Sequence, residues 1–145
     1  ARDAEARAAV ASLFRTEGGS PDMVRALVRR TMSGACGVGR TATGLAYLRE
    51  CLDGLAEEGV AARSAPETAS AVEAMNILLV ARLIATAAAA RDESRGPHLR
   101  FDDAGRTLPR DDARWRQYLV LSVDEGAIRC AARCLVRPAW EMAAD

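Results

Sequence analysis

The sequence predicts an all-α protein, an up-and-down antiparallel bundle of three to four helices with an irregular C-terminal tail that includes, in one interpretation, a small β-hairpin. Apolar residues recur at three- and four-residue spacing as far as about residue 92, which is the period of a helix with one buried face. Glycine and proline interrupt this pattern at short intervals, and short connections favour antiparallel neighbours. A chain of 145 residues fits one such domain.

The first two helices are expected at 3–16 and 21–33. Ser20 offers an N-cap hydroxyl to the second helix, Pro21 suits its first position, and the carboxylate of Asp22 favours the positive end of the helix dipole. The side chains expected to face the core from this helix are Met23, Leu27 and Val28.

A third helix is expected at 42–58, with Thr41 or Thr43 as its cap and Gly59 at its end. Its inward residues recur at coiled-coil-like spacing and are Leu45, Leu48, Leu52 and Leu55. The glycine-rich connection before it follows a helix rather than a strand and lacks the G-x-G-x-x-G spacing of a dinucleotide site, so we interpret it as a structural turn.

The longest helix is expected at 66–93. Its inward face is expected to consist of Val72, Met75, Asn76, Leu79, Leu83 and Ile84. Gly96 and Pro97 provide the stop signal, because glycine adopts the left-handed conformation and proline lacks the amide proton. Arg82 interrupts the apolar run, so we expect a soluble protein without direct membrane contact rather than a span of about 20 apolar residues.

The segment after this helix is expected to be an irregular surface stretch over 101–112, followed by the tail. Strand-forming residues at 118–123, a turn signal at 124–126 and alternating residues at 128–136 favour a terminal hairpin. The alternative is a short helix, with one face formed by Ile128, Ala131, Ala132 and Leu135.

The composition excludes several classes of protein. The 20 basic and 20 acidic residues cancel, and no basic block is interleaved with aromatic residues, so we expect no nucleic-acid partner. No signal peptide opens the sequence, which favours a cytoplasmic protein. The cysteines form no C-x-x-C pair, and we interpret them as thiols in a reducing compartment rather than as metal ligands: Cys36, Cys51, Cys130 and Cys134.

One cluster of polar residues could carry chemistry, and it consists of Glu93, Arg95, His98, Arg100 and Asp102. A histidine can act as an acid or a base near neutral pH. A lone histidine after a helix end more commonly bonds carbonyl groups, and a neighbouring carboxylate and guanidinium commonly form an ion pair. We therefore predict a structural role and no catalytic residue in this cluster.

Four collinear segments carry a resemblance to a known family. Residues 93–100 match the E-S-R-G-x-H-x-R signature of the succinate dehydrogenase, fumarate reductase and L-aspartate oxidase flavoproteins. Residues 32–40 resemble the M-x-x-x-x-G-[VI]-x-R turn of that family, 76–81 its N-x-L-x-V-A helix and 110–115 its R-D-D-x-x-W block. The chain therefore resembles the C-terminal helical domain of these enzymes, and Met75 departs from the family's usual arginine.

This resemblance implies a parent enzyme that binds FAD, with the flavin-binding and capping domains as partners of this domain. It implies that the chain alone binds no cofactor and is not catalytic, and that it can self-associate when isolated. The expected organisation is a leading helix and linker over 1–20, the bundle over 21–117 and the tail over 118–145. The residues expected to serve structure or docking are Arg40, Asn76, Glu93, Ser94, Arg95, His98 and Arg100.

Within the family, the short interval from Arg40 to Asn76 favours L-aspartate oxidase, which oxidises L-aspartate to iminoaspartate for NAD biosynthesis. The R-D-D-x-x-W block and the hairpin also suit the succinate and fumarate enzymes, which remain the alternative. A freestanding helical interaction module is the alternative from a different class.

Overall fold

The computed structural model describes residue 4, residues 17–124 and residues 126–134. About 53% of the protein is helical and a small antiparallel sheet is present, so the fold is mostly helical, as expected, but not strictly all-α. The helix expected at 3–16 lies outside the described residues except for Ala4, which is helical.

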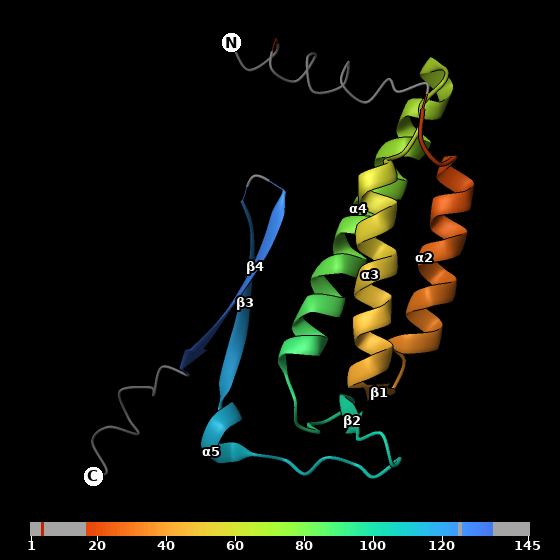
Figure 1. Ribbon diagram of the computed structural model, residues 1–145. Helices are drawn as coiled ribbons and strands as arrows, with labels where there is room; N and C mark the ends of the chain where they lie inside the picture. Colours follow the sequence, from red (N-terminus) through yellow and green to blue (C-terminus); the bar gives the residue numbers. More distant parts are fainter. Residues whose placement is uncertain (1–3, 5–16, 125, 135–145) are drawn as a thin grey trace.

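Three long helices form the body of the protein: α2 (Pro21–Ala35), α3 (Ala42–Glu58) and α4 (Ala65–Ala90). Figure 1 shows them side by side with alternating directions, as the up-and-down prediction required. The core between them consists mainly of Val24, Val28, Leu45, Leu48, Leu52, Ala71, Ala74, Leu78, Ala81 and Ala85.

The ends of α2 and α3 follow the predicted capping residues. Ser20 Oγ accepts a hydrogen bond from the Met23 amide at 3.3 Å, and Thr41 Oγ1 accepts one from the Gly44 amide at 3.0 Å. Gly59 follows α3 with φ of 78°, a conformation that favours glycine. Local sequence therefore specifies these two helices almost to the residue.

The buried face of α4 differs from the prediction. Leu79 and Ile84, expected in the core, are 36% and 45% exposed, whereas Leu78 is buried. The other buried positions of α4 are alanines: Ala71, Ala74, Ala81, Ala85 and Ala88. The helix is apolar around most of its circumference, so the spacing of apolar residues did not identify the buried face. The buried face is the one with small side chains, because these let α2 and α3 approach closely. Met23 of α2 is likewise 40% exposed, contrary to expectation.

Helix α4 ends before the predicted stop signal. It finishes at Ala90, and Arg91 already has extended backbone angles, φ −91° and ψ 107°. Gly96 has φ of 55°, but it lies in a tight turn in which Arg95 and His98 exchange backbone hydrogen bonds of 2.9 and 3.0 Å. The glycine therefore reverses the chain after the helix instead of capping it.

Two short strands at the lower end of the bundle in Figure 1 were not predicted. Strands β1 (Gly39–Thr41) and β2 (Leu99–Phe101) pair in parallel, with Arg40 opposite Arg100. The stretch that follows, 102–111, is irregular as expected apart from the isolated bridge of Thr107 to Phe101, and the short helix α5 (Asp112–Trp115) begins where it ends. This pairing brings the 32–40 turn and the 93–100 signature together.

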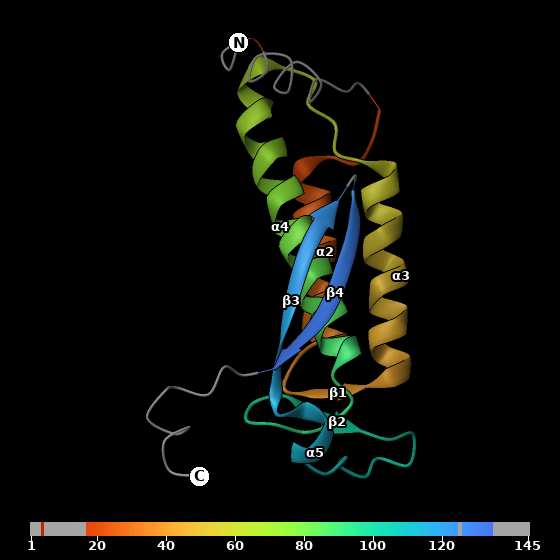
Figure 2. The same cartoon turned by 90° about the vertical axis from the view of Figure 1, so that its left-hand side faces the viewer.

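The predicted hairpin is confirmed over the helical alternative. Strand β3 (Gln117–Asp124) pairs antiparallel with β4 (Ala127–Cys134), and both strands contact α4. Figure 2 shows the hairpin lying along α4. The hairpin side chains that are half-buried alternate along both strands and include Leu119, Leu121, Ile128 and Cys130.

Helix α4 is also the one helix of the described residues that is long and apolar enough to cross a membrane by length and composition. Core helices of helical bundles have the same properties. Here α4 contacts α2, α3 and the hairpin, and Arg82 donates to Asp53 of α3 at 2.8 Å.

Candidate functional site

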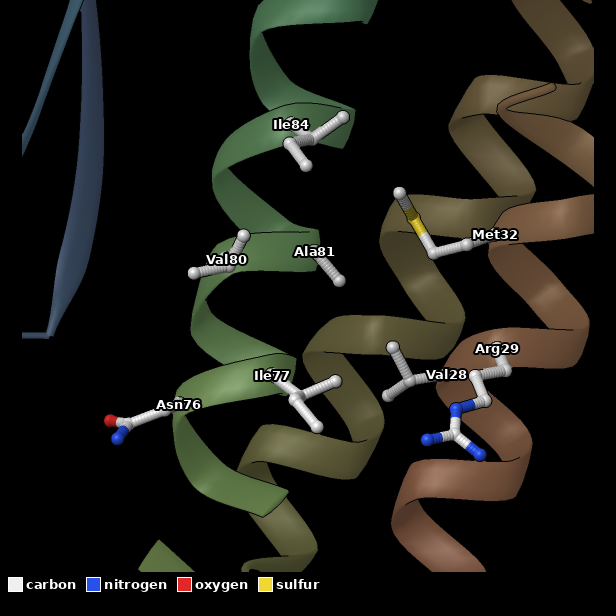
Figure 3. Close-up of a pocket in the computed structure, with 8 residues that line it drawn as sticks. All are labelled: Val28, Arg29, Met32, Asn76, Ile77, Val80, Ala81 and Ile84. Atoms are coloured by element: carbon white, nitrogen blue, oxygen red, sulfur yellow. The ribbon is translucent and has the colours of Figure 1, made fainter. Parts of the chain in front are cut away.

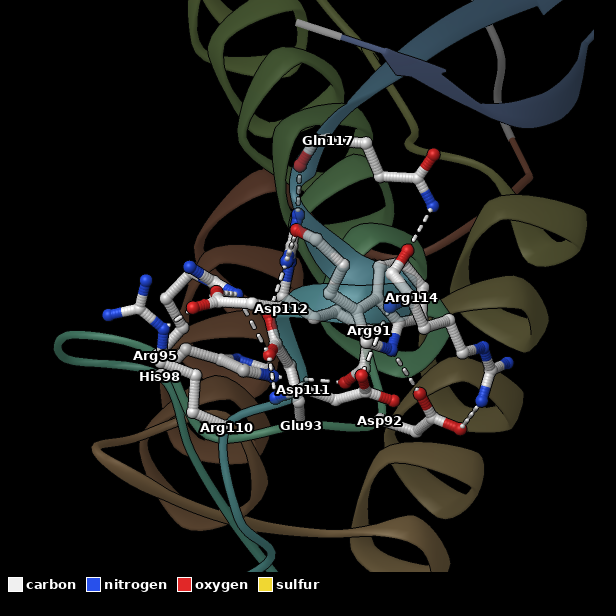
Figure 4. A network of polar contacts seen from close by, with 11 residues as sticks. Arg91, Asp92, Glu93, Arg95, His98, Arg110, Asp111, Asp112, Arg114 and Gln117 are labelled. Atoms are coloured by element: carbon white, nitrogen blue, oxygen red, sulfur yellow. Dashed lines mark hydrogen bonds and ion pairs between the residues drawn. The ribbon is translucent and has the colours of Figure 1, made fainter.

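The candidate site is a network of charged residues at the end of the bundle where α2 and α4 finish. Its central residue is Glu93, whose side chain is 1% exposed. Arg91 and Arg95 each donate to Oε1 at 2.6 Å, while Arg95 also donates to Oε2 at 3.1 Å and the Asp111 amide donates to Oε2 at 2.7 Å (Figure 4). A buried carboxylate is stable only with such partners.

These partners hold Glu93 in its ionised form. The hydrogen bonds from Arg95, the Asp111 amide and Arg91 outweigh the effect of burial and lower the pKa of Glu93 to about 2. A carboxylate with such a pKa is a poor general acid or base near neutral pH, because it stays ionised there. The geometry thus favours an ion pair over proton transfer.

A second carboxylate extends the network toward solvent. Asp112 accepts from Arg110 at 2.8 Å and from Arg95 at 2.7 Å, and these two guanidinium groups lower its pKa. The Asp112 side chain is more than half exposed, so this contact contributes less than the buried one.

The other end of the network reaches the hairpin. Arg91 donates at 2.8 Å to the backbone carbonyl of Gln117, and Gln117 is the first residue of β3. Arg91 and Arg114 lie over the ring of the buried Trp115, 4.9 and 5.1 Å from its centroid. The end of α4, helix α5 and the hairpin are therefore connected through these side chains.

His98 is held by hydrogen bonds at both ring nitrogens. Arg40 donates to Nδ1 at 2.5 Å, so Nε2 carries the proton and donates to the Arg91 carbonyl at 3.0 Å. Burial, followed by the charges of Arg40, Arg100 and Arg91, lowers the pKa of His98. The imidazole is neutral at pH 7, and both nitrogens are engaged.

Ser94 and Arg100 stabilise the returning strand β2. Ser94 Oγ accepts from the Arg100 amide at 3.0 Å and donates to the Arg100 carbonyl at 3.3 Å. The Arg100 side chain turns back to α4, where one terminal nitrogen donates to the Ala88 carbonyl at 3.4 Å. Arg100 is 4% exposed, and burial lowers the pKa of its guanidinium.

Asp102, expected in the same cluster, lies outside this network, because its carboxylate accepts from the Ala104 amide and from the amide and Nε of Arg106. Asn76 also lies away from the network. It is exposed on α4 and belongs to an apolar groove of about 380 Å³ between α2 and α4 (Figure 3). We call this the α2/α4 groove. It is lined by Val28, Arg29, Met32, Asn76, Ile77, Val80, Ala81 and Ile84.

The sequence patterns did not identify eight further residues of the network as site residues, namely Arg91, Asp92, Arg110, Asp111, Asp112, Arg114, Trp115 and Gln117. The 110–115 block contains five of them and matched a family pattern, so its position was a usable signal. Gln117 contributes its backbone carbonyl, which no side-chain pattern reveals.

Neither a metal nor a dinucleotide fits the described residues well. They contain no group of three potential metal ligands. Strand β1 leads into α3 without a glycine turn, and Thr41 already occupies the Gly44 amide in the first turn of α3, where a phosphate would need free donors. The start of α3 is therefore not a phosphate site of the dinucleotide-binding type.

Comparisons with known proteins agree on one family. The sequence matches the family "Fumarate reductase flavoprotein C-term" over residues 25–136. It is 36% identical over 109 residues to the L-aspartate oxidase of Streptomyces coelicolor, a match that covers 72% of this chain and 18% of that protein. The chain therefore spans about a fifth of the length of this curated relative.

Solved structures show the same fold. The FrdA mutant of E. coli quinol fumarate reductase matches with a TM-score of 0.80 at 24% identity, over 95% of this chain and 25% of that one. Mycobacterium smegmatis Sdh1 in complex with UQ1 matches with a TM-score of 0.73 at 26% identity, over 91% of this chain and 23% of that one.

Proposed function

Because the chain belongs to the family of fumarate reductase flavoprotein C-terminal domains, we propose that it is the helical docking domain of a cytoplasmic L-aspartate oxidase. The parent enzyme would bind FAD in another domain and pass a hydride from L-aspartate to the flavin, giving iminoaspartate for NAD biosynthesis. This chain would contribute no catalytic residue, and its network would hold the end of the domain in shape.

The observation that carries the choice of substrate is the 36% identity to an L-aspartate oxidase. Succinate dehydrogenase or fumarate reductase is the second candidate, and the 26% identity to Sdh1 supports it less strongly. The ion-paired Glu93 and the doubly bonded His98 support a structural rather than a catalytic role.

The α2/α4 groove supports docking. Val80 and Ile84, at 52% and 45% exposure, form an apolar surface that a neighbouring domain would cover. The flavin-binding and capping domains of the parent enzyme are the proposed partners. In their absence, a second copy of this chain could cover the same surface.

The test of the substrate is flavin reduction by the longer protein that contains this chain. We expect L-aspartate, added without oxygen, to bleach the absorbance of bound FAD, and succinate to leave it unchanged. Loss of the FAD absorbance with succinate but not with L-aspartate would contradict this assignment and indicate that the parent enzyme is a succinate dehydrogenase or fumarate reductase. Titration of this chain with FAD should give no binding at micromolar concentration, and stoichiometric binding would contradict the docking role.

A further inference from the structure

Two arginines at the signature end of the bundle lie next to each other on paired strands. Arg40 of β1 and Arg100 of β2 are register partners in the parallel pair, and we call them the helix-end arginine pair. Arg40 donates to the Cys36 carbonyl at the end of α2, and Arg100 donates to the Ala88 carbonyl near the end of α4, both at 3.4 Å.

The guanidinium groups of this pair are incompletely bonded. The Nε atoms of Arg40 and Arg100 are buried, and neither has a hydrogen-bond acceptor in the part of the chain that the structure describes. Arg91 and Arg95, by contrast, share the carboxylate of Glu93. An almost fully buried arginine without a carboxylate is unusual, because the loss of hydration is then uncompensated.

The charges around the pair leave an excess of about one positive unit. Two guanidinium groups supply two positive charges, and the C-terminal ends of α2 and α4 together offset about one of them, since each carries about half a negative charge. His98 is neutral and accepts from Arg40. Asp92, whose charge acts on Arg100, is already bound by Trp115 and Arg114.

We propose that the helix-end arginine pair binds one carboxylate, supplied by an acidic side chain from another part of the longer protein. A carboxylate matches both the excess charge and the planar donors of a guanidinium. The source of the carboxylate rests on the proposed function, in which this chain is one domain of a larger flavoprotein. The site itself depends only on this chain.

The test uses the 145-residue chain and acetate as a probe for the side chain. Thermal unfolding is measured at pH 7 in sodium acetate and in sodium chloride of equal ionic strength. Acetate should raise the melting temperature saturably, by about 2 °C or more near saturation, because a ligand that binds only the folded state stabilises it. The saturable part of this response should disappear in Arg100→Met. Any general effect of acetate on apolar burial remains in the variant and can be subtracted from the response of the wild type.

The variant also separates a binding role from a structural one. In chloride, Arg100→Met should keep or raise the melting temperature, since it removes an uncompensated charge. Arg49→Met is the matched control on an exposed arginine and should keep the full response to acetate. A large loss of stability for Arg100→Met in chloride, or an equal acetate response in both proteins, would overturn the proposal and leave Arg100 as an anchor of α4.

Two further measurements identify the source. Succinate acting at a concentration tenfold below acetate would point to a free dicarboxylate and overturn the side-chain source. In the longer protein, the acetate response should be absent because the acidic side chain already occupies the pair. Neither result depends on FAD or on turnover, so a wrong choice of parent reaction and a wrong carboxylate site give different outcomes.

Discussion

The indole nitrogen of Trp115 donates a hydrogen bond of 2.6 Å to the carboxylate of Asp92. This contact connects the chain just after α4 with the last residue of α5. Arg114 donates to the other oxygen of the same carboxylate at 2.7 Å, and both hydrogen bonds lower the pKa of Asp92 against the opposing effect of its partial burial. The hairpin begins two residues later, so its position on α4 depends on this contact.

Trp115→Phe should therefore destabilise the protein. Phenylalanine keeps the apolar ring but has no donor for Asp92, and we expect the free energy of unfolding to fall by about 1 to 2 kcal/mol. Urea denaturation followed by circular dichroism measures this change. Tyr118→Phe is the control on an exposed aromatic residue, with an expected change below about 0.5 kcal/mol. Equal effects of the two substitutions would show that the indole bond contributes nothing.

Glu93→Gln should be more damaging. Glutamine has nearly the same shape but no charge, so Arg91 and Arg95 lose the buried carboxylate that they share. Breaking such a pair costs about 3 to 5 kcal/mol. Asp112→Asn removes an exposed carboxylate that pairs with Arg95, and it should lower the free energy of unfolding by less than about 1 kcal/mol. The ranking would fail if both variants unfolded at the same urea concentration.

Acid should remove the contribution of Glu93. Its pKa is lowered to about 2 in the folded protein, against 4.5 for an ordinary glutamate, so the unfolded chain takes up the proton first. The stabilisation is nearly complete above pH 4.5 and declines as the pH falls toward 2, by about 3 kcal/mol. Comparing the pH dependence of unfolding in the wild type and in Glu93→Gln measures this contribution of Glu93 to the free energy of unfolding. Parallel curves for the two proteins below pH 4.5 would contradict the assignment.

Adjacent leucines of α4 should differ sharply. Leu78 is 5% exposed in the core, so Leu78→Ala should lower the free energy of unfolding by about 2 to 5 kcal/mol. Leu79 is partly exposed, and Leu79→Ala should cost less than about 1 kcal/mol in this chain. Urea midpoints of the two variants give the comparison directly. A larger loss of stability for Leu79→Ala than for Leu78→Ala would show that the core face of α4 is the one that the spacing of apolar residues predicted.

The α2/α4 groove should control self-association of the isolated chain. Val80→Asp places a charge in an exposed apolar surface and should lower the apparent mass at concentrations where the wild type associates. Sedimentation velocity over a concentration series measures this apparent mass. Tyr47→Asp changes an exposed residue outside the groove and should behave as the wild type. A wild type that stays monomeric, or a variant that associates equally, would contradict this role.

Local signals in the sequence were sufficient for most helix boundaries. Ser20 and Thr41 cap their helices as predicted, because a cap depends on residues three positions apart. The face of α4 required information that the sequence does not contain locally. Its circumference offers larger apolar residues such as Leu79 as well as alanines, and only the approach of α2 and α3 selects the alanines for burial.

The candidate site shows the same division. The signature placed Glu93, Arg95, His98 and Arg100 in one segment, but their partners come from elsewhere in the chain. Arg40 reaches His98 only because β1 and β2 pair, and strands of three residues give almost no pattern to detect. Long-range contacts of this kind follow from the packing of the helices rather than from spacing.

The parallel pairing of β1 with β2 also sets an order of events during folding. Strand β2 can reach β1 only after the chain has passed through α3 and α4, so closing this pair first would cost the entropy of a long unstructured loop. Two helices that already pack against each other shorten that search. The charged network at this end closes later still, because its partners Asp111, Trp115 and Gln117 follow β2 in the chain.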